Sequence, residues 1–180
     1  MTASKTSFFG YGSLVNLATH IYENPRQASV TGWRREWVTS NSRDVSYLSI
    51  RPDPDCTIDG MKADVAGIGW DALDEREAGY NRLDPANADF QVYVADPDFI
   101  DATGPTKPIL LSYIDCVIQG FHTHYGDKGV ARFFDTTTAW DRPILNDRKT
   151  PLYPRAQVLS PIETGLVDEH LEHLKVQIIS

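Results

Sequence analysis

The feature that most constrains the fold is a short stretch near the start of the chain, Phe8-Phe9-Gly10-Tyr11-Gly12-Ser13-Leu14. Its aromatic side chains favour an extended, half-buried conformation, which predicts a strand at residues 7–11. The two glycines allow the backbone to turn sharply and let a ligand come close to it. Ser13 suits the start of a helix or a tight turn, because its hydroxyl accepts hydrogen bonds from free backbone N–H groups.

A strand that ends in such a turn has two interpretations. It is either a structural bend or a row of N–H donors that binds a carboxylate or an oxyanion. The stretch by itself favours the structural bend. Gly10 and Gly12 lack the third glycine of a dinucleotide-binding fingerprint, and Ser13 lacks the following glycine of a nucleophile elbow. Neither a nucleotide site nor a nucleophilic serine is therefore indicated.

The rest of the chain predicts short strands interrupted by turns, followed by helices. Further strands are expected over residues 27–39 with a bend at Gly32, 45–51 closed by Pro52-Asp53-Pro54-Asp55, 63–70, 90–95 and 109–114. Helices are expected after Asp71 as a cap, over residues 116–138 with a break at Gly126, and from the capping box Ser160-Pro161-Ile162-Glu163. Residues 139–156 are expected to form an ordered surface loop.

These elements predict the α+β class, with a small mixed, largely antiparallel β-barrel and helices packed outside it. The length of 180 residues fits a single domain spanning residues 1–180.

Charge and cysteine content exclude several classes of partner. The chain has 17 basic and 25 acidic residues, a net charge of −8. This balance disfavours nucleic acid and anionic membranes as partners. The sequence shows no signal-peptide pattern and no apolar run that would span a bilayer. Together with two distant cysteines, Cys56 and Cys116, this predicts a cytoplasmic protein with reduced thiols.

The histidines do not predict a metal site. His122 and His124 are two residues apart, and on a helix such side chains point away from each other. No cysteine or carboxylate spacing completes a ligand set. His170 and His173 share a helix face but are explained by the negative end of that helix.

The carboxylate most open to a catalytic interpretation is Glu77, in Leu73-Asp74-Glu75-Arg76-Glu77-Ala78-Gly79-Tyr80. A charged helix of this kind is most simply a solvated surface. However, Gly79-Tyr80 ends the helix abruptly, and a carboxylate beside such a break can point inward. Burial would then raise its pKa towards the range of a general base.

Three stretches together resemble the γ-glutamylcyclotransferase superfamily. They are Phe9-Gly10-Tyr11-Gly12-Ser13-Leu14, Arg76-Glu77-Ala78-Gly79-Tyr80 and Gly32-Trp33-Arg34-Arg35-Glu36-Trp37. The first is closest to the glutathione-specific ChaC-type branch. Order and spacing agree over roughly residues 7–115. The region between Trp70 and Glu77 is shorter than in that branch, and the stretch from Trp140 to Ala156 departs from its pattern.

The resemblance implies cyclisation of a γ-glutamyl amino acid or peptide, such as glutathione, to 5-oxoproline, with release of the amine. It implies Glu77 as the catalytic acid–base. The implied substrate-binding residues are Gly10, Tyr11, Gly12, Ser13, Leu14 and Val15, with Tyr153 as the match to a loop tyrosine of the family. A small γ-glutamyl substrate is implied, with no metal and no redox cofactor.

Two other functions fit the same residues. One is a γ-glutamyl-binding protein without activity, since a fold does not fix a function. The other is a cyclotransferase that acts on γ-glutamylamines, such as crosslinked lysine. The sequence leaves the leaving group and the oligomeric state open.

Overall fold

The computed structural model describes residues 5–180 and has the predicted α+β class. The strands are β1 (Ser7–Gly10), β2 (Glu23–Thr39), β3 (Ser46–Asp64), β4 (Tyr80–Leu83), β5 (Val92–Ala95), β6 (Ile109–Leu110), β7 (Thr137–Thr138), β8 (Ile144–Leu145) and β9 (Ile178–Ile179). The α-helices are α1 (Trp70–Arg76), α2 (Leu111–Asp135) and α3 (Pro161–His173). Within residues 5–180, no helix combines the length and the apolar character that crossing a membrane requires.

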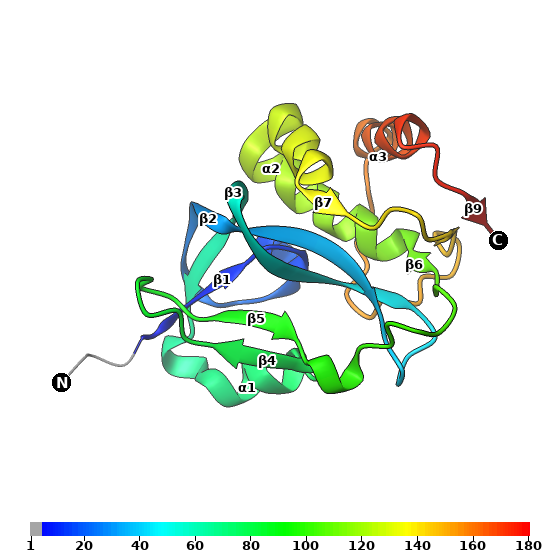
Figure 1. Ribbon diagram of the computed structural model, residues 1–180. Helices are drawn as coiled ribbons and strands as arrows, with labels where there is room; N and C mark the ends of the chain where they lie inside the picture. The colour runs from blue at the N-terminus through cyan, green and yellow to red at the C-terminus, as the bar shows by residue number, and fades with distance from the viewer. Residues whose placement is uncertain (1–4) are drawn as a thin grey trace.

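The long antiparallel hairpin of β2 and β3 forms the centre of the molecule. The largest sheet has the order β1-β3-β2-β7, and β4 pairs with β5 in a second antiparallel sheet. The third sheet, β6-β8-β9, is short and parallel. In Figure 1, α2 and α3 lie on one side of the hairpin, whereas α1 lies on the other side, against β4 and β5. The predicted, largely antiparallel pairing is confirmed.

Strand β5 lies next to both β1 and β3 of the main sheet. Next to it, Phe9 N–H donates to Gln91 O at 2.9 Å, and Gln91 N–H donates to Ser7 O at 2.8 Å. At its other end, Ala95 N–H donates to the Ser49 hydroxyl of β3 at 3.0 Å. The sheets therefore curve around a shared interior. Closure into one continuous barrel stays a prediction.

The interior is filled mainly by aromatic and aliphatic side chains from β1, the hairpin and α2. The largest fully buried apolar side chains include Phe8, Phe9, Trp37, Leu48, Ile58, Met61, Phe121 and Phe133. Helix α2 is buried on several faces because the hairpin covers one side of it and α3 packs on another. This packing holds the turn at Ser13–Val15, which follows β1, against α2.

The expected end of a strand at Pro52 is wrong, because β3 continues to Asp64. The pairing with β2 shifts register between Thr31 and Gly32, which leaves Pro54 in an irregular stretch of β3. A proline has no N–H to donate, and such a bulge is where a sheet tolerates one. Gly32 has φ of 99°, so the predicted bend at this residue is confirmed.

Two other expected strands are also wrong in their extent. Residues 63–70 contain only the end of β3, followed by a 3₁₀ turn and the start of α1. Gly69, with φ of 82°, is the N-cap of α1, so Asp71 does not cap it. Residues 109–114 contain two strand residues before α2 begins at Leu111. A short apolar run is buried equally well as a strand or a helix, and periodicity does not separate the two.

The helical predictions near the C-terminus are confirmed. Helix α2 breaks at Gly126, where φ is 63° and ψ is −169°. Helix α3 begins with the full capping box, in which Ser160 and Glu163 each accept a hydrogen bond from the other's backbone. The expected loop over residues 139–156 is wrong in part, because it contains β8, which pairs with β6 and β9. Between β8 and α3, residues 146–160 form a loop with no helix or strand.

Candidate active site

The site begins where β1 runs into a tight turn. Val15 N–H donates to Gly12 O at 3.0 Å, which closes a 3₁₀ turn over Ser13–Val15. A Cβ atom on Gly10 would lie 2.4 Å from the Cβ of Leu14, and one on Gly12 would lie 2.6 Å from the hydroxyl of Tyr113. The chain therefore folds back too closely at Gly10 to leave room for a side chain, whereas a Cβ atom at Gly12 would displace the Tyr113 hydroxyl.

A buried arginine of β2 holds this turn from behind. Arg35 is fully buried and donates Nε to Tyr11 O at 2.7 Å, Nη1 to the Thr136 hydroxyl at 2.8 Å and Nη2 to Asp59 O. Its guanidinium lies 5.0 Å from the ring centres of two phenylalanines of α2. Burial lowers the pKa of Arg35 to about 10, so it remains charged at neutral pH. The turn is thus tied to the central hairpin.

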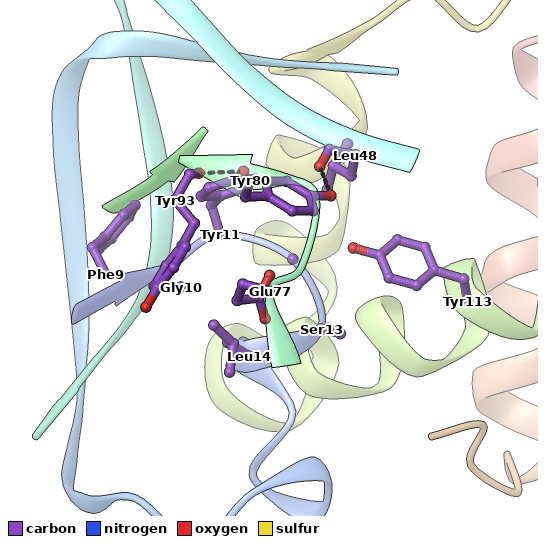
Figure 2. Close-up of a pocket in the computed structure, with 11 residues that line it drawn as sticks. Phe9, Gly10, Tyr11, Ser13, Leu14, Leu48, Glu77, Tyr80, Tyr93 and Tyr113 are labelled. Atoms are coloured by element: carbon purple, nitrogen blue, oxygen red, sulfur yellow. Dashed lines mark hydrogen bonds between the residues drawn. The ribbon is translucent and has the colours of Figure 1, made fainter. Parts of the chain in front are cut away.

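Glu77 enters the site from the end of α1. Its N–H donates to Leu73 O at 2.9 Å, and its carbonyl accepts from Tyr80 N–H at 3.0 Å. Gly79 has φ of 97°, a conformation that glycine adopts at low cost, and it reverses the chain into β4. The reversal turns the carboxylate towards the turn of β1, and its side chain is only 17% exposed (Figure 2).

Burial dominates the electrostatics of Glu77. It raises the pKa of the carboxyl above the ordinary value, while the guanidinium groups of Arg76, Arg155 and Arg43 act in the opposite direction. The nearest is Arg76, whose Nε lies 3.3 Å from Oε1. Because Arg76 also donates to the carbonyl and hydroxyl of Thr19 at 2.8 and 3.0 Å, its position is fixed. The net effect is a carboxylate that accepts a proton more readily than one in water.

The turn and Glu77 line one inner pocket. Its other walls are aromatic or aliphatic. The lining residues are Phe9, Gly10, Tyr11, Gly12, Ser13, Leu14, Leu48, Glu77, Tyr80, Tyr93 and Tyr113 (Figure 2). The structure thus brings together Glu77 and five of the seven residues expected to bind substrate.

The other two expected residues lie elsewhere. Val15 is fully buried, does not line the pocket and uses its N–H within the turn. Tyr153 lines a second, outer pocket, and its ring packs edge-on against Tyr113 with 5.0 Å between the ring centres.

Three tyrosines of the inner pocket differ in how their hydroxyls are used. Tyr11 donates to Tyr93 O at 2.7 Å, and Tyr80 donates to Leu48 O at 2.6 Å, so both bind backbone. In Figure 2 the Tyr113 hydroxyl points into the pocket, and within residues 5–180 it has no hydrogen-bond partner. Tyr113 was not among the site residues predicted from the sequence. The signal available was a phenol inside an apolar run, which needs a partner when it is buried.

The outer pocket adjoins the inner one and shares Ser13, Glu77, Tyr80 and Tyr113 with it. Its own walls come from four parts of the chain. They are Arg43, Val45, Ser46 and Tyr47 before and in β3, Arg76 and Ala78 beside Glu77, and Leu110, Leu152, Tyr153, Pro154 and Arg155 on the far side. Glu77 therefore lies at the junction of the two spaces.

Residues 5–180 contain no cluster of three or more histidine, cysteine or carboxylate side chains placed to hold a metal ion.

No protein-family model matches the chain, and no curated protein matches it by sequence. Solved structures do. YkqA from Bacillus subtilis aligns with a TM-score of 0.54 and 15% identity, over 73% of this chain and 53% of that one, so the chain spans about half of YkqA. A structure described as gamma-glutamyl cyclotransferase aligns with a TM-score of 0.52 and 12% identity, over 91% of this chain and 98% of that one. The chain has the γ-glutamylcyclotransferase-like fold.

An uncharacterised protein from Homo sapiens aligns nearly as well, with a TM-score of 0.51, 12% identity and the same coverage. At these identities the likeness concerns the γ-glutamylcyclotransferase-like fold alone. The resemblance to the superfamily is therefore supported at the level of fold, and these neighbours do not single out the ChaC-type branch.

Proposed function

We propose that the protein is a γ-glutamylcyclotransferase, which converts a γ-glutamyl amino acid or peptide to 5-oxoproline and the released amine. The observation that carries the proposal is the inner pocket, where a largely buried carboxylate with a raised pKa faces a backbone turn. Burial disfavours the charged form of this carboxylate, and a protein that only binds its ligand has no need for such a group. The γ-glutamylcyclotransferase-like fold supports the same reaction class.

In this reaction the α-amine of the γ-glutamyl group attacks its own γ-carbonyl carbon. The amine is an ammonium in water, so Glu77 first accepts one of its protons. The C–N bond that closes the five-membered ring then forms, and the old γ-amide C–N bond breaks after its nitrogen receives a proton from Glu77. The ring nitrogen loses its second proton as well, and the released amine takes it up as an ammonium. No water is consumed. Both reacting groups belong to one molecule, so the pocket has mainly to hold them in a reactive geometry.

The turn and Tyr113 supply the hydrogen-bond donors of the proposed site. Backbone N–H groups of the Gly10–Leu14 turn bind the γ-glutamyl carboxylate, the developing oxyanion or both. The Tyr113 hydroxyl, which has no partner in residues 5–180, faces the same space and serves the γ-carbonyl oxygen. Tyr11 and Tyr80 bind backbone and shape the walls.

Incubation with γ-glutamylalanine, other γ-glutamyl amino acids and glutathione is expected to yield 5-oxoproline in equal amount to the released amine. α-Glutamylalanine is the matched control, because its amide carbonyl cannot close a five-membered ring with its own amine. Chromatography of both products measures the reaction. Calorimetric binding of γ-glutamyl compounds with no 5-oxoproline would instead identify a binding protein.

The pH profile follows from the raised pKa of Glu77. The base works only as the carboxylate, so kcat/KM is expected to rise with pH through the pKa of Glu77 in the folded protein. Because burial raises that pKa, the midpoint is expected above 4.5, the ordinary value. Initial rates between pH 4 and 8 at constant ionic strength measure it, with circular dichroism as the folding control. A midpoint at or below 4.5 would contradict the assignment.

A further inference from the structure

The outer pocket carries positive charge that the proposed chemistry at Glu77 does not require. Three arginines line it, Arg43, Arg76 and Arg155, and Glu77 is the only carboxylate in its lining. The chain as a whole has a net charge of −8, so this wall opposes the overall sign. Such a concentration of guanidinium groups favours an anionic group on the ligand.

The three arginines differ in how far they are already engaged. Arg76 is held by Thr19, and Arg43 donates Nη2 to Ala78 O at 2.6 Å. Arg155 is half-buried, and within residues 5–180 its guanidinium has neither a hydrogen-bond partner nor an ion pair. Its planar group of five donors is therefore available to a ligand carboxylate, which it matches in a bidentate geometry.

The loop that carries Arg155 is fixed to the body of the protein. Asp147, 7% exposed, accepts hydrogen bonds from Ser112 N–H and Leu152 N–H, both at 2.8 Å. The Ser112 hydroxyl donates to the other side of the same carboxylate, at 2.6 Å. This loop is thus anchored to the first turn of α2. A guanidinium held on an ordered loop loses less conformational entropy when it binds.

The position of the outer pocket relative to Glu77 decides which part of a substrate would reach it. A γ-glutamyl arm in the inner pocket places its γ-amide beside Glu77, and the leaving group then extends into the outer pocket. An amino acid or peptide leaving group carries a carboxylate there, whereas a simple alkylamine carries none. On the basis of the proposed function, we propose that Arg155 is a specificity-determining residue that binds the carboxylate of the leaving amino acid or peptide, with Arg43 as a second cation of the same wall.

The substrate has a second carboxylate that could bind Arg155, the α-carboxylate of the γ-glutamyl group. It belongs to the half of the substrate that becomes 5-oxoproline and is common to all γ-glutamyl compounds. The leaving-group carboxylate can be removed without changing it, by converting γ-glutamylalanine to its alanine amide. This substrate pair separates the two sources.

The test measures kcat/KM for γ-glutamylalanine and γ-glutamylalanine amide with the unmodified protein and with Arg155→Met. The unmodified protein is expected to prefer the acid by about 10- to 100-fold, as the loss of a charge-assisted hydrogen bond implies. Arg155→Met is expected to lower kcat/KM for the acid to near the value for the amide, while the amide changes by less than about twofold. Because Arg155 also lowers the pKa of Glu77, both proteins are compared on the plateau of their pH profiles, where Glu77 is ionised. Arg155→Lys restores part of the preference. Lys149→Met, an exposed change in the same loop, is the matched control.

Equal loss on both substrates would overturn the proposal, since it would place Arg155 on the γ-glutamyl half or in the support of the fold. Equal turnover of acid and amide by the unmodified protein would overturn it as well.

Calorimetric titration of Glu77→Gln with the same pair gives a readout that does not need turnover. Tighter binding of the acid, lost in Glu77→Gln/Arg155→Met, supports the carboxylate site even if no 5-oxoproline forms from any compound. In that case the proposed cyclisation fails and the binding site stands. Turnover without any preference for the acid would support the proposed cyclisation and overturn the carboxylate site.

Discussion

Replacing Glu77 by glutamine is expected to lower kcat/KM for γ-glutamyl substrates by about 10²- to 10⁴-fold. Glutamine keeps the shape and the hydrogen-bonding capacity of the side chain but cannot accept the proton of the α-ammonium. Rates of 5-oxoproline formation measure the effect. Substrate affinity in calorimetry is expected to change far less, because the turn and the pocket walls remain.

The control variant is Glu75→Gln, an exposed carboxylate two residues earlier in α1. It changes the charge of the chain by the same amount and is expected to leave the rate within about twofold of the unmodified protein. Undiminished turnover by Glu77→Gln, with this control also active, would contradict the catalytic assignment.

The pH dependence of stability is also expected to differ between the unmodified protein and Glu77→Gln. Burial raises the pKa of Glu77, so between the unfolded and folded pKa values the folded state binds more protons. The unmodified protein therefore loses stability, relative to Glu77→Gln, as pH rises through the folded pKa. Urea unfolding at acidic and neutral pH checks this difference, which also shows that the glutamine variant is folded when it is inactive.

Replacing Arg35 by methionine is expected to destabilise the protein by about 2–5 kcal/mol. The loss leaves the carbonyls of Tyr11 and Asp59 and the hydroxyl of Thr136 without their donor in a buried region. It also removes the cation that packs against two phenylalanine rings. Urea unfolding measures the change, which is a large part of the stability of an ordinary domain.

The neighbouring Arg34 provides a matched control. It pairs with Asp53 at 2.6 Å, and its side chain is 26% exposed. Such a surface pair contributes at most about 1 kcal/mol, so Arg34→Met is expected to have a small effect. Equal effects of the two substitutions would contradict the role given to Arg35. Arg35→Met is also expected to impair turnover, because the freed Tyr11 carbonyl belongs to the turn that lines the inner pocket.

The parts of the site that could be predicted from the sequence are those set by local chemistry. Gly10, Gly12 and Gly79 mark places where the backbone turns sharply, and such turns follow from a few neighbouring residues. The resemblance then connected the first turn with Glu77. Val15 was included by its position in the stretch, but the 3₁₀ turn directs it into the core.

The parts that could not be predicted depend on contacts between distant segments. The donors of Arg35 reach three separate parts of the chain, and nothing local distinguishes it from exposed Arg34. Tyr113 looks like a core residue of an apolar run until α2 places its hydroxyl beside Gly12. Pro52 and Leu111 were misassigned for a related reason, since register and packing decide where β3 ends and α2 begins.

The anchoring of the 146–160 loop by Asp147 has an evolutionary consequence. The inner pocket is built from residues 9–93 together with Tyr113, whereas most of the far wall of the outer pocket comes from a separate stretch of the chain. Asp147 ties that stretch to Ser112 and Arg148 ties it to Asp115, so its residues outside these attachments are free to vary. Under the proposed function, selection for a new leaving group can then act on this module without disturbing Glu77.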